Sequence, residues 1–321
     1  MTRILAYRFS AFGDVAMTAP VFREFVEQNP GVRIVMVSRT AFADLFEGIP
    51  NLEFVGINLE DYKGFFGMRR LAKELTDTYH PDFVANLHDV IRTKILYRLL
   101  TRRGLKIFKI NKGKEEKEHL TDVWNLEKTQ LKRTVERYAD VFREMGFNVE
   151  LSHQYRPRVL EKSGIGIAPF AQHKGKMLSL EKSFEVANIL SERQKIYFFG
   201  GGKDEAEILA DWERLIPNSE NLAGKLTLKQ ELNKIASLEV MISMDSANMH
   251  LASLMGTRCI SVWGSTHHFA GFLGYGQSEQ DIVHVKDLSC RPCSVFGDKE
   301  CYRGDWACLE ELHVKQIIDK I

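Results

Sequence analysis

Short apolar segments alternate with segments of helical spacing along this chain, and no other feature constrains the fold as strongly. After an apolar start, strand-like segments recur in the first half at 33–38, 53–57, 83–87 and 106–110. Each is separated from the next by room for a helix or a long loop. Strands that alternate with helices form parallel sheets with helices packed on them. The pattern therefore predicts an α/β fold.

A second alternating series begins after an irregular stretch between Gly146 and Gly164. We expect strands at 164–168, 195–199, 239–243 and 258–263, and helices at 180–190, 204–215, 228–236 and 247–254. A chain of 321 residues is long enough for two α/β domains. We place the domains at 1–158 and 159–321. Two such Rossmann-like halves facing each other would form an interdomain cleft, where ligands commonly bind.

Three further segments have weaker patterns. The hydrophilic stretch 111–118 is predicted to be a mobile loop, and 130–145 returns to helical periodicity. A helix from Val15 to Gln28 follows the first strand, with apolar residues at helical spacing. The last segment, 310–321, is predicted to be a short amphipathic helix.

The charge of the chain is balanced, with 44 Lys and Arg against 43 Asp and Glu. There is thus no overall basic field that would favour nucleic acid. Local basic runs at 92–117 and 128–137 are more typical of solvated helix faces than of phosphate or membrane contacts. No apolar run approaches the roughly 20 residues that span a bilayer. Arg8 interrupts the first apolar strand, which is not the pattern of a signal peptide, and we expect a cytoplasmic protein.

Four of the five cysteines lie near the end of the chain, at Cys290, Cys293, Cys301 and Cys308. A chain this long with so few cysteines is not a secreted disulfide scaffold. Tetrahedral zinc needs four ligands, but a zinc ribbon usually repeats the close pair, and only one close pair occurs here. We expect reduced thiols and no cofactor, with a structural zinc at these four residues as the alternative.

Asp14 stands at a helix entrance, directly after the first strand and its small-residue turn. That position is the carboxyl edge of a strand, where ligands bind in open α/β sheets. Asp is also a preferred helix N-cap, with no catalytic role. The residues alone leave both interpretations open. A capping carboxylate near a helix dipole makes a weaker base, which could still accept a proton late in a reaction.

A second polar motif follows the apolar strand at 239–243. Asp245 and Ser246 end this strand and open a helix, so their backbone N–H groups offer an anion site. His250 lies about one turn into the helix and can face the same ligand, although a half-buried helix histidine is the simpler interpretation. The turn at 263–266, which ends with Thr266, has small residues that let the backbone approach phosphate.

Two loops after strands carry further candidate groups. Lys174 and Lys176 flank a glycine and could neutralise a leaving diphosphate, or could be merely solvated. The glycines at 200–202 precede Asp204 and Glu205 but lack the G-x-G-x-x-G spacing of a dinucleotide fingerprint. This departure argues against an oxidoreductase.

Together these motifs resemble the ADP-heptose:lipopolysaccharide heptosyltransferases, glycosyltransferase family 9, and the likeness runs nearly end to end. The family opens with a small-x-x-Gly-Asp-Val/Ile turn followed by Thr and Pro. This chain carries that turn at Ser10, Gly13, Asp14, Val15, Thr18 and Pro20. The family's Asp-Ser/Thr-Gly-x-x-His segment is matched by Asp245, Ser246, Ala247 and His250. Its loop lysine corresponds to Lys176, and its Gly-x-x-x-Glu turn to 201–205.

The resemblance implies the GT-B fold of two Rossmann-like domains, with the acceptor bound by the first domain and the nucleotide sugar by the second. It implies an inverting, metal-independent transfer in which Asp14 is the general base and Lys176 faces the diphosphate. The implied donor-binding residues are Glu205, Asp245, Ser246, Ala247, His250 and Thr266. Asp204 is the alternative to Glu205 at the adenosine ribose.

The implied acceptor is an anionic sugar on a lipid, such as a Kdo-lipid A core. Candidate acceptor-binding residues are Arg8, Ser10, Gly13 and Arg92, with Lys94 and Arg98 as further cations that could contact acceptor or membrane. The protein would then work at the cytoplasmic face of the inner membrane as a peripheral protein, with no nucleic-acid partner.

The sequence departs from the family in two places. Ala247 replaces the usual glycine, and the helix after Lys176 lacks its usual Trp-Pro. Two alternatives therefore stay open. One is glycosyl transfer to a protein or a different glycan. The other is a non-catalytic nucleotide-binding protein on the same scaffold, for which Ala247 is the only sequence support.

Overall fold

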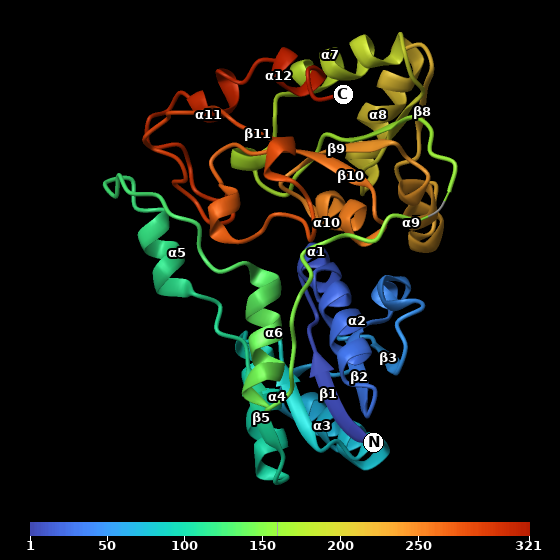
Figure 1. Ribbon diagram of the computed structural model, residues 1–321, viewed down its shortest axis with the longest axis vertical. Helices are drawn as coiled ribbons and strands as arrows, with labels where there is room; N and C mark the ends of the chain where they lie inside the picture. Colours follow the sequence, from blue (N-terminus) through green and yellow to red (C-terminus); the bar gives the residue numbers. More distant parts are fainter. Residues whose placement is uncertain (159) are drawn as a thin grey trace. The chain divides into compact units, whose positions relative to one another are not determined.

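The computed structural model describes residues 1–158 and 160–321 and contains two compact units (Figure 1). The first unit comprises Met1–Lys112 and Thr134–Ser152, and the second comprises Gly113–Arg133 and His153–Ile321. The sequence analysis did not anticipate that Gly113–Arg133 groups with the second unit. Its domain boundary adjoins Val159, which lies outside the described residues.

A five-stranded parallel sheet forms the centre of the first unit, in the order β3-β2-β1-β4-β5. Its strands are β1 Thr2–Tyr7, β2 Val32–Arg39, β3 Leu52–Ile57, β4 Phe83–Asn86 and β5 Lys106–Lys109. The last four residues of β1 are fully buried, as expected for a central parallel strand covered on both faces. The apolar start of the chain is β1, and the four strands predicted at 33–38, 53–57, 83–87 and 106–110 are confirmed to within one residue at each end.

Helices cover both faces of this sheet. They are α1 Phe12–Ala16, α2 Thr18–Gln28, η1 Thr40–Phe46, α3 Gly64–Tyr79, α4 Ile91–Arg102 and α6 Thr134–Glu144. The chain passes from β1 to β2 in one direction but from β3 to β4 and β5 in the other, so right-handed crossovers put α2 and the α3/α4 pair on opposite faces. Accordingly, α2 packs against α6 and α3 packs against α4.

The second unit contains a six-stranded parallel sheet in the order β11-β10-β9-β6-β7-β8. Its strands are β6 Ile165–Ala168, β7 Ile196–Phe198, β8 Ser219–Asn221, β9 Val240–Met244, β10 Arg258–Val262 and β11 Ile282–Val283. The two edge strands, β8 and β11, were not predicted. The first is polar and the second has two residues, so neither carries an apolar run.

The longer helices of the second unit agree with the sequence pattern. They are α7 Leu180–Ser191, α8 Lys203–Leu215, α9 Leu228–Ala236 and α10 Ala247–Leu254. Ser179 caps α7, and Thr227 with Gln230 forms a capping box on α9. The shorter elements are α5 Lys114–Leu120, η2 Lys174–Lys176, η3 His268–Ala270, η4 Glu279–Asp281, α11 Ala307–Glu310 and α12 Lys315–Ile318.

Three local predictions were wrong. The segment 111–118, expected to be a loop, contains most of α5, whose first turn carries Glu115 and Glu116 at the favourable end of the helix dipole. The helix expected from Val15 to Gln28 is interrupted at Met17, which places Pro20 in the first turn of α2, where its missing N–H costs nothing. The final helix is two single turns, α11 and α12.

None of the helices in residues 1–158 and 160–321 is long and apolar enough to cross a bilayer.

Phe142 is the side chain that joins α6 to α2. It is fully buried, stacks on Phe25 with ring centroids 4.5 Å apart, and meets Phe22 edge-on at 5.9 Å. We expect Phe142→Ala to lower the free energy of unfolding by about 3–5 kcal/mol, because it leaves a cavity in a closed core. Urea unfolding followed by circular dichroism measures this loss.

The matched control is Phe66→Ala in the same unit, at an exposed position. Its effect should stay within about 0.5 kcal/mol. Equal effects of the two substitutions would show that α6 does not contribute to the core of the first unit.

Candidate functional site

Polar side chains gather at one place in each unit, beyond the carboxyl ends of parallel strands. In the first unit the cluster surrounds Asp14, after β1. In the second unit it surrounds Asp245, after β9. Because ligands bind at this edge of open α/β sheets, each cluster is a candidate site.

Asp14 lies in the first turn of α1 but does not cap it. The N-cap is Ala11, and no side chain makes a capping hydrogen bond there. The Asp14 carboxylate instead pairs with the guanidinium of Arg8, with Nη2 and Oδ2 2.7 Å apart. The N-cap interpretation of Asp14 is therefore wrong, and its carboxylate is held by a side chain from the end of β1.

Arg8 is buried and fixed by several contacts. Its Nη1 donates to the carbonyl of Leu87 at 2.5 Å, and its guanidinium lies 5.5 Å from the centre of the Tyr138 ring. The Arg8 carbonyl accepts a hydrogen bond from the hydroxyl of Ser38 at 2.5 Å. A buried guanidinium needs such partners to offset its lost hydration. Arg8 thus presents a fixed positive charge to Asp14.

His88, which follows β4, joins the same cluster. Its Nδ1 accepts a hydrogen bond from the backbone N–H of Phe9 at 3.4 Å, which assigns the proton to Nε2, 3.3 Å from the hydroxyl of Ser10. Burial lowers the pKa of His88 to about 3, and the charges of Arg8 and Lys112 act in the same direction. His88 is therefore neutral near pH 7 and holds Ser10 in place.

Lys112 adds a second cation to this cluster. Its Nζ donates to the carbonyl of Asp89 at 3.3 Å, and burial lowers its pKa, followed in size by the effect of Arg8. The sequence analysis named neither His88 nor Lys112. The signal was present, because both follow predicted strands at the edge that carries Asp14. The other two acceptor candidates lie apart from these contacts: Gly13 is buried within α1, and Arg92 is exposed in the first turn of α4.

In the second unit, three predicted residues from separate segments converge. The Nζ of Lys176 lies 2.9 Å from Oδ2 of Asp245, and the hydroxyl of Thr266 donates to the same oxygen at 2.9 Å. The side chain of Asp245 is 4% exposed and that of Lys176 is 18% exposed. A carboxylate this deeply buried depends on both partners for its charge to be tolerated.

The backbone beside Lys176 is tightly packed against the turn at 263–266. The carbonyl of Gly175 accepts hydrogen bonds from both the N–H and the hydroxyl of Ser265, at 2.7 and 2.9 Å. A Cβ on Gly175 would lie 2.3 Å from the Ser265 hydroxyl, and one on Gly264 would lie 2.5 Å from the Gly175 carbonyl. Glycine is required at both positions. This contact fixes the backbone from which the Lys176 side chain projects.

Arg291 also fixes the turn at 263–266. Arg291 was not among the residues predicted from the sequence. Its guanidinium is buried and donates to the carbonyls of Gly264 at 2.5 Å, Thr266 at 2.9 Å and Trp263 at 3.3 Å. Burial lowers the pKa of Arg291 to about 10, so it remains a cation near neutral pH. No sequence signal distinguishes it from the other arginines.

The remaining predicted donor residues lie near the cluster or beside it. Ser246 is the N-cap of α10, with its hydroxyl 3.2 Å from that of Ser243, and Ala247 is the first residue of the helix. His250 is buried on the same helix. Glu205 lies in the first turn of α8 and accepts a hydrogen bond from the N–H of Gly201 at 2.7 Å. Glu205 therefore stabilises its own glycine turn.

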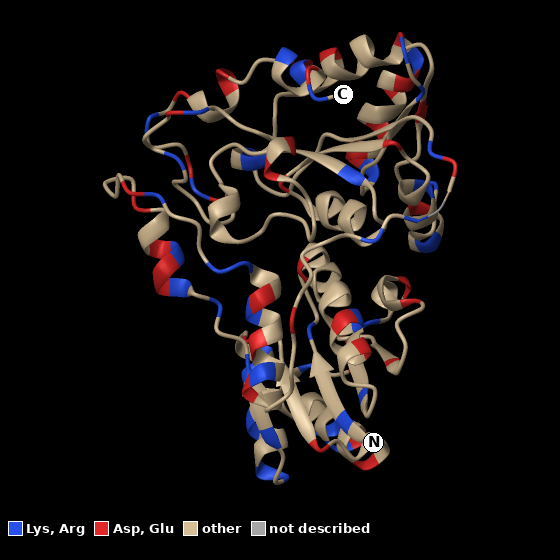
Figure 2. Ribbon diagram, viewed as in Figure 1, with Lys and Arg blue, Asp and Glu red and all other residues tan. Residues whose placement is uncertain are grey.

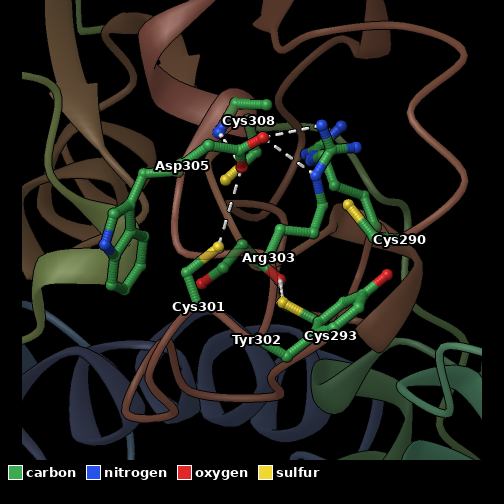
Figure 3. A pocket seen from close by; sticks show the side chains of 11 residues that line it. Cys290, Cys293, Cys301, Tyr302, Arg303, Asp305 and Cys308 are labelled. Carbon is green, nitrogen blue, oxygen red and sulfur yellow. Dashed lines mark hydrogen bonds and ion pairs between the residues drawn. The ribbon is translucent and has the colours of Figure 1, made fainter.

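The four C-terminal cysteines line one small pocket, shown in Figure 3. Burial raises the pKa of Cys293, and raises that of Cys308 to about 12, so these thiols are protonated at neutral pH. Among the residues that the structure describes, no three His, Cys, Asp or Glu side chains are arranged to hold a metal ion. The described residues therefore provide no set of side chains that fits a zinc ion at this pocket.

Comparison with known proteins gives a consistent family. A model of glycosyltransferase family 9 (heptosyltransferase) matches residues 68–302 of this chain. Lipooligosaccharide heptosyltransferase 2 of Campylobacter jejuni is 24% identical over 318 residues, which cover 96% of this chain and 95% of that protein.

Two solved structures share the fold. A family 9 glycosyltransferase from Veillonella parvula is 17% identical, with a TM-score of 0.75 over 99% of this chain and 95% of that one. The heptosyltransferase WaaC of E. coli, solved with ADP-2-deoxy-2-fluoro heptose, is 17% identical, with a TM-score of 0.70 over 99% of each chain. Both are similar along nearly the whole chain.

Three neighbouring histidines make stability depend on pH. Burial lowers the pKa of His267 to about 2 and those of His268 and His284 to about 4. In the unfolded chain each would titrate near 6.5. Below that pH the unfolded chain binds more protons than the folded chain, so the free energy of unfolding should fall between pH 6.5 and pH 4, by at most about 1.4 kcal/mol per pH unit for each histidine.

Urea unfolding at a series of pH values measures this slope. His267→Gln should reduce the slope of the free energy of unfolding against pH by the contribution of one histidine, because glutamine does not titrate. Gln316→Ala, at an exposed, non-titrating position of the same unit, is the matched control and should leave the slope unchanged. The explanation fails if His267→Gln and the parent protein give the same slope.

Proposed function

Because this chain belongs to glycosyltransferase family 9, the heptosyltransferase family, and has the GT-B fold, we propose that it transfers heptose from ADP-heptose to the core of lipopolysaccharide, on a Kdo-lipid A acceptor. The observation that carries the proposal is the buried ion pair between Lys176 and Asp245, joined by Thr266, beyond the end of β9. The proposed transfer inverts the anomeric centre and uses no metal.

On the donor side, Lys176 is the group proposed to face the diphosphate. An ammonium has three N–H groups, and its ion pair with Asp245 uses one of them. Asp245 thereby orients Lys176 without occupying all its donors. The first-turn N–H groups of α10, after Ser246, add partial positive charge for the same anion.

The remaining donor roles follow the family motif. Ala247 and His250 are proposed to line the donor site, and Glu205 to contact the adenosine ribose. Glu205 can do so only with the oxygen that does not bind Gly201, which restricts its orientation. The methyl group of Ala247 would keep the donor's phosphates slightly further from the backbone than a glycine would.

The proposed reaction is a single in-line displacement. The acceptor hydroxyl oxygen forms a bond to the anomeric carbon, while the bond from that carbon to the diphosphate oxygen breaks. ADP leaves with the electron pair, and the hydroxyl proton moves to Asp14. Negative charge grows on the diphosphate while the sugar ring gains oxocarbenium character. Lys176 and the N–H groups of α10 are proposed to stabilise that negative charge.

Asp14 suits the role of general base in its geometry. Its Oδ2 is fixed by Arg8 at 2.7 Å, and its carboxylate is partly exposed. The carboxylate would accept the proton late, when the new bond to carbon has largely formed and the attacking hydroxyl has become acidic. The Arg8 and Lys112 cations in the same cluster would attract an anionic acceptor sugar, with Ser10, Gly13 and Arg92 as further contacts.

The direct test combines the purified protein with ADP-heptose and Kdo-lipid A, and follows both ADP release and acceptor mass. The protein should add the mass of one heptose. Asp14→Asn should lower turnover by roughly 10² to 10⁴-fold, because the proton acceptor is lost. It should still bind ADP-heptose in calorimetry.

Asp77→Asn, at an exposed residue of the same unit paired with Arg103, is the matched control and should retain turnover. A fully active Asp14→Asn protein would contradict the base assignment. Without ADP release or mass gain, other nucleotide sugars and protein acceptors become the substrates to test.

Lys176→Ala tests the donor side. We expect turnover to fall by about 10²-fold or more, because a group that stabilises the leaving diphosphate is removed. Calorimetry should also show weaker binding of ADP-heptose, which separates this variant from Asp14→Asn. Lys225→Ala, at an exposed lysine of the same unit paired with Glu213, is the control. Unchanged donor binding by Lys176→Ala would contradict the role of Lys176.

A further inference from the structure

We propose that the first turns of α3 and α4 dock on an anionic lipid bilayer. We define this docking surface by three exposed apolar residues, Phe65, Phe66 and Ile91, and three exposed cations, Arg92, Lys94 and Arg98. The inference rests on the proposed function only in that the acceptor is lipid-linked. Its main test uses no substrate.

The apolar part of the docking surface consists of side chains that the fold does not bury. Phe65 is 49% exposed, Phe66 79% and Ile91 82%. Helix α3 buries its opposite side on the sheet through Met68 and Leu71. The two phenylalanine rings contact each other edge-on, with centroids 5.8 Å apart, and so form one apolar projection. Large apolar side chains that project together mark an interaction site more often than isolated ones do.

The charge along α4 is one-sided, although the charge of the whole chain is balanced. Residues 91–112 contain eight Lys and Arg and no Asp or Glu. Figure 2 shows the resulting basic character of α4. None of Arg92, Lys94 and Arg98 forms an ion pair with a carboxylate in the described part of the chain. Near the start of α3, by contrast, Lys63 pairs with Glu60, so the net positive charge comes from α4.

The cations lie close enough to the apolar residues to act with them. Along a helix that rises 1.5 Å per residue, Arg98 is about 10 Å from Ile91. That is slightly more than the Debye length of about 8 Å at physiological ionic strength, whereas Arg92 and Lys94 lie within about 5 Å of Ile91 along the axis. A surface that inserts Phe65, Phe66 and Ile91 into a head-group layer therefore brings the α4 cations within range of lipid phosphates. Lys or Arg beside Phe is typical of helices that bind anionic membranes.

The docking surface lies at the same edge of the sheet as the proposed base. α3 follows β3 and α4 follows β4, so both helices begin at the carboxyl edge of the sheet, and they pack against each other. Asp14 follows β1 at the same edge. A bilayer bound at this edge would present a lipid-linked acceptor beside the proposed base. Because Asp14 and the docking surface share this edge, a membrane is favoured over a protein as the partner that binds the surface.

The test is co-sedimentation of the full chain with vesicles. The protein should bind vesicles of phosphatidylglycerol and phosphatidylethanolamine, bind phosphatidylcholine vesicles weakly, and dissociate as salt is raised. The double variant Phe65→Ser, Phe66→Ser should bind the anionic vesicles at least about tenfold more weakly. Leu215→Ser, at an exposed leucine of the second unit, is the matched control and should bind as the parent does.

Two results would overturn the proposal: no binding of the parent to anionic vesicles, or parent-like binding by the double variant. Either result would leave a protein as the occupant of the surface. Circular dichroism of the double variant checks that it is folded.

An activity assay separates this proposal from the proposed function. The double variant should transfer heptose to a delipidated, water-soluble acceptor at the parental rate, and more slowly to acceptor embedded in vesicles. Loss of transfer to both acceptors would contradict the docking role. If neither protein transfers heptose to any acceptor, the proposed function fails while the vesicle-binding result still stands.

Discussion

The ion pair between Lys176 and Asp245 is the interaction on which the second unit's site depends. Asp245 is almost completely buried, so its charge requires both Lys176 and the Thr266 hydroxyl. This requirement explains why the neighbouring backbone is so restricted. Gly175 and Gly264 allow the two loops to touch, and Arg291 ties the 263–266 turn in place through backbone carbonyls. Much of this region serves to hold one ammonium group at the end of β9.

The first unit also pairs a buried charge with a more exposed one, but the signs of the two charges are exchanged. There the fixed group is the cation, Arg8, which is buried at the end of β1, and the partly exposed group is the carboxylate of Asp14. In both units a buried charge orients a more accessible partner of opposite sign. An enzyme that removes a proton from one substrate and stabilises negative charge on another needs these two groups. The pattern thus agrees with glycosyl transfer in family 9.

Sequence periodicity predicted most of both sheets, because buried parallel strands are continuous apolar runs. It missed β8 and β11, whose pairing comes from neighbouring strands and not from their own residues. Among the site residues, Lys176, Asp245 and Thr266 were predicted, since each follows a strand in a motif. His88 and Lys112 also follow strands but lie in no motif. Arg291 acts entirely through backbone carbonyls brought close by the fold, which no pattern in the sequence records.

A crystal structure of the protein with ADP-heptose bound, or with a non-reactive fluoro analogue, tests the central claim most directly. The account predicts that a diphosphate oxygen lies within about 2.7–3.2 Å of the Nζ of Lys176. It also predicts that Asp245 stays paired with that lysine. A diphosphate bound elsewhere, with Lys176 making no contact to it, would contradict the account.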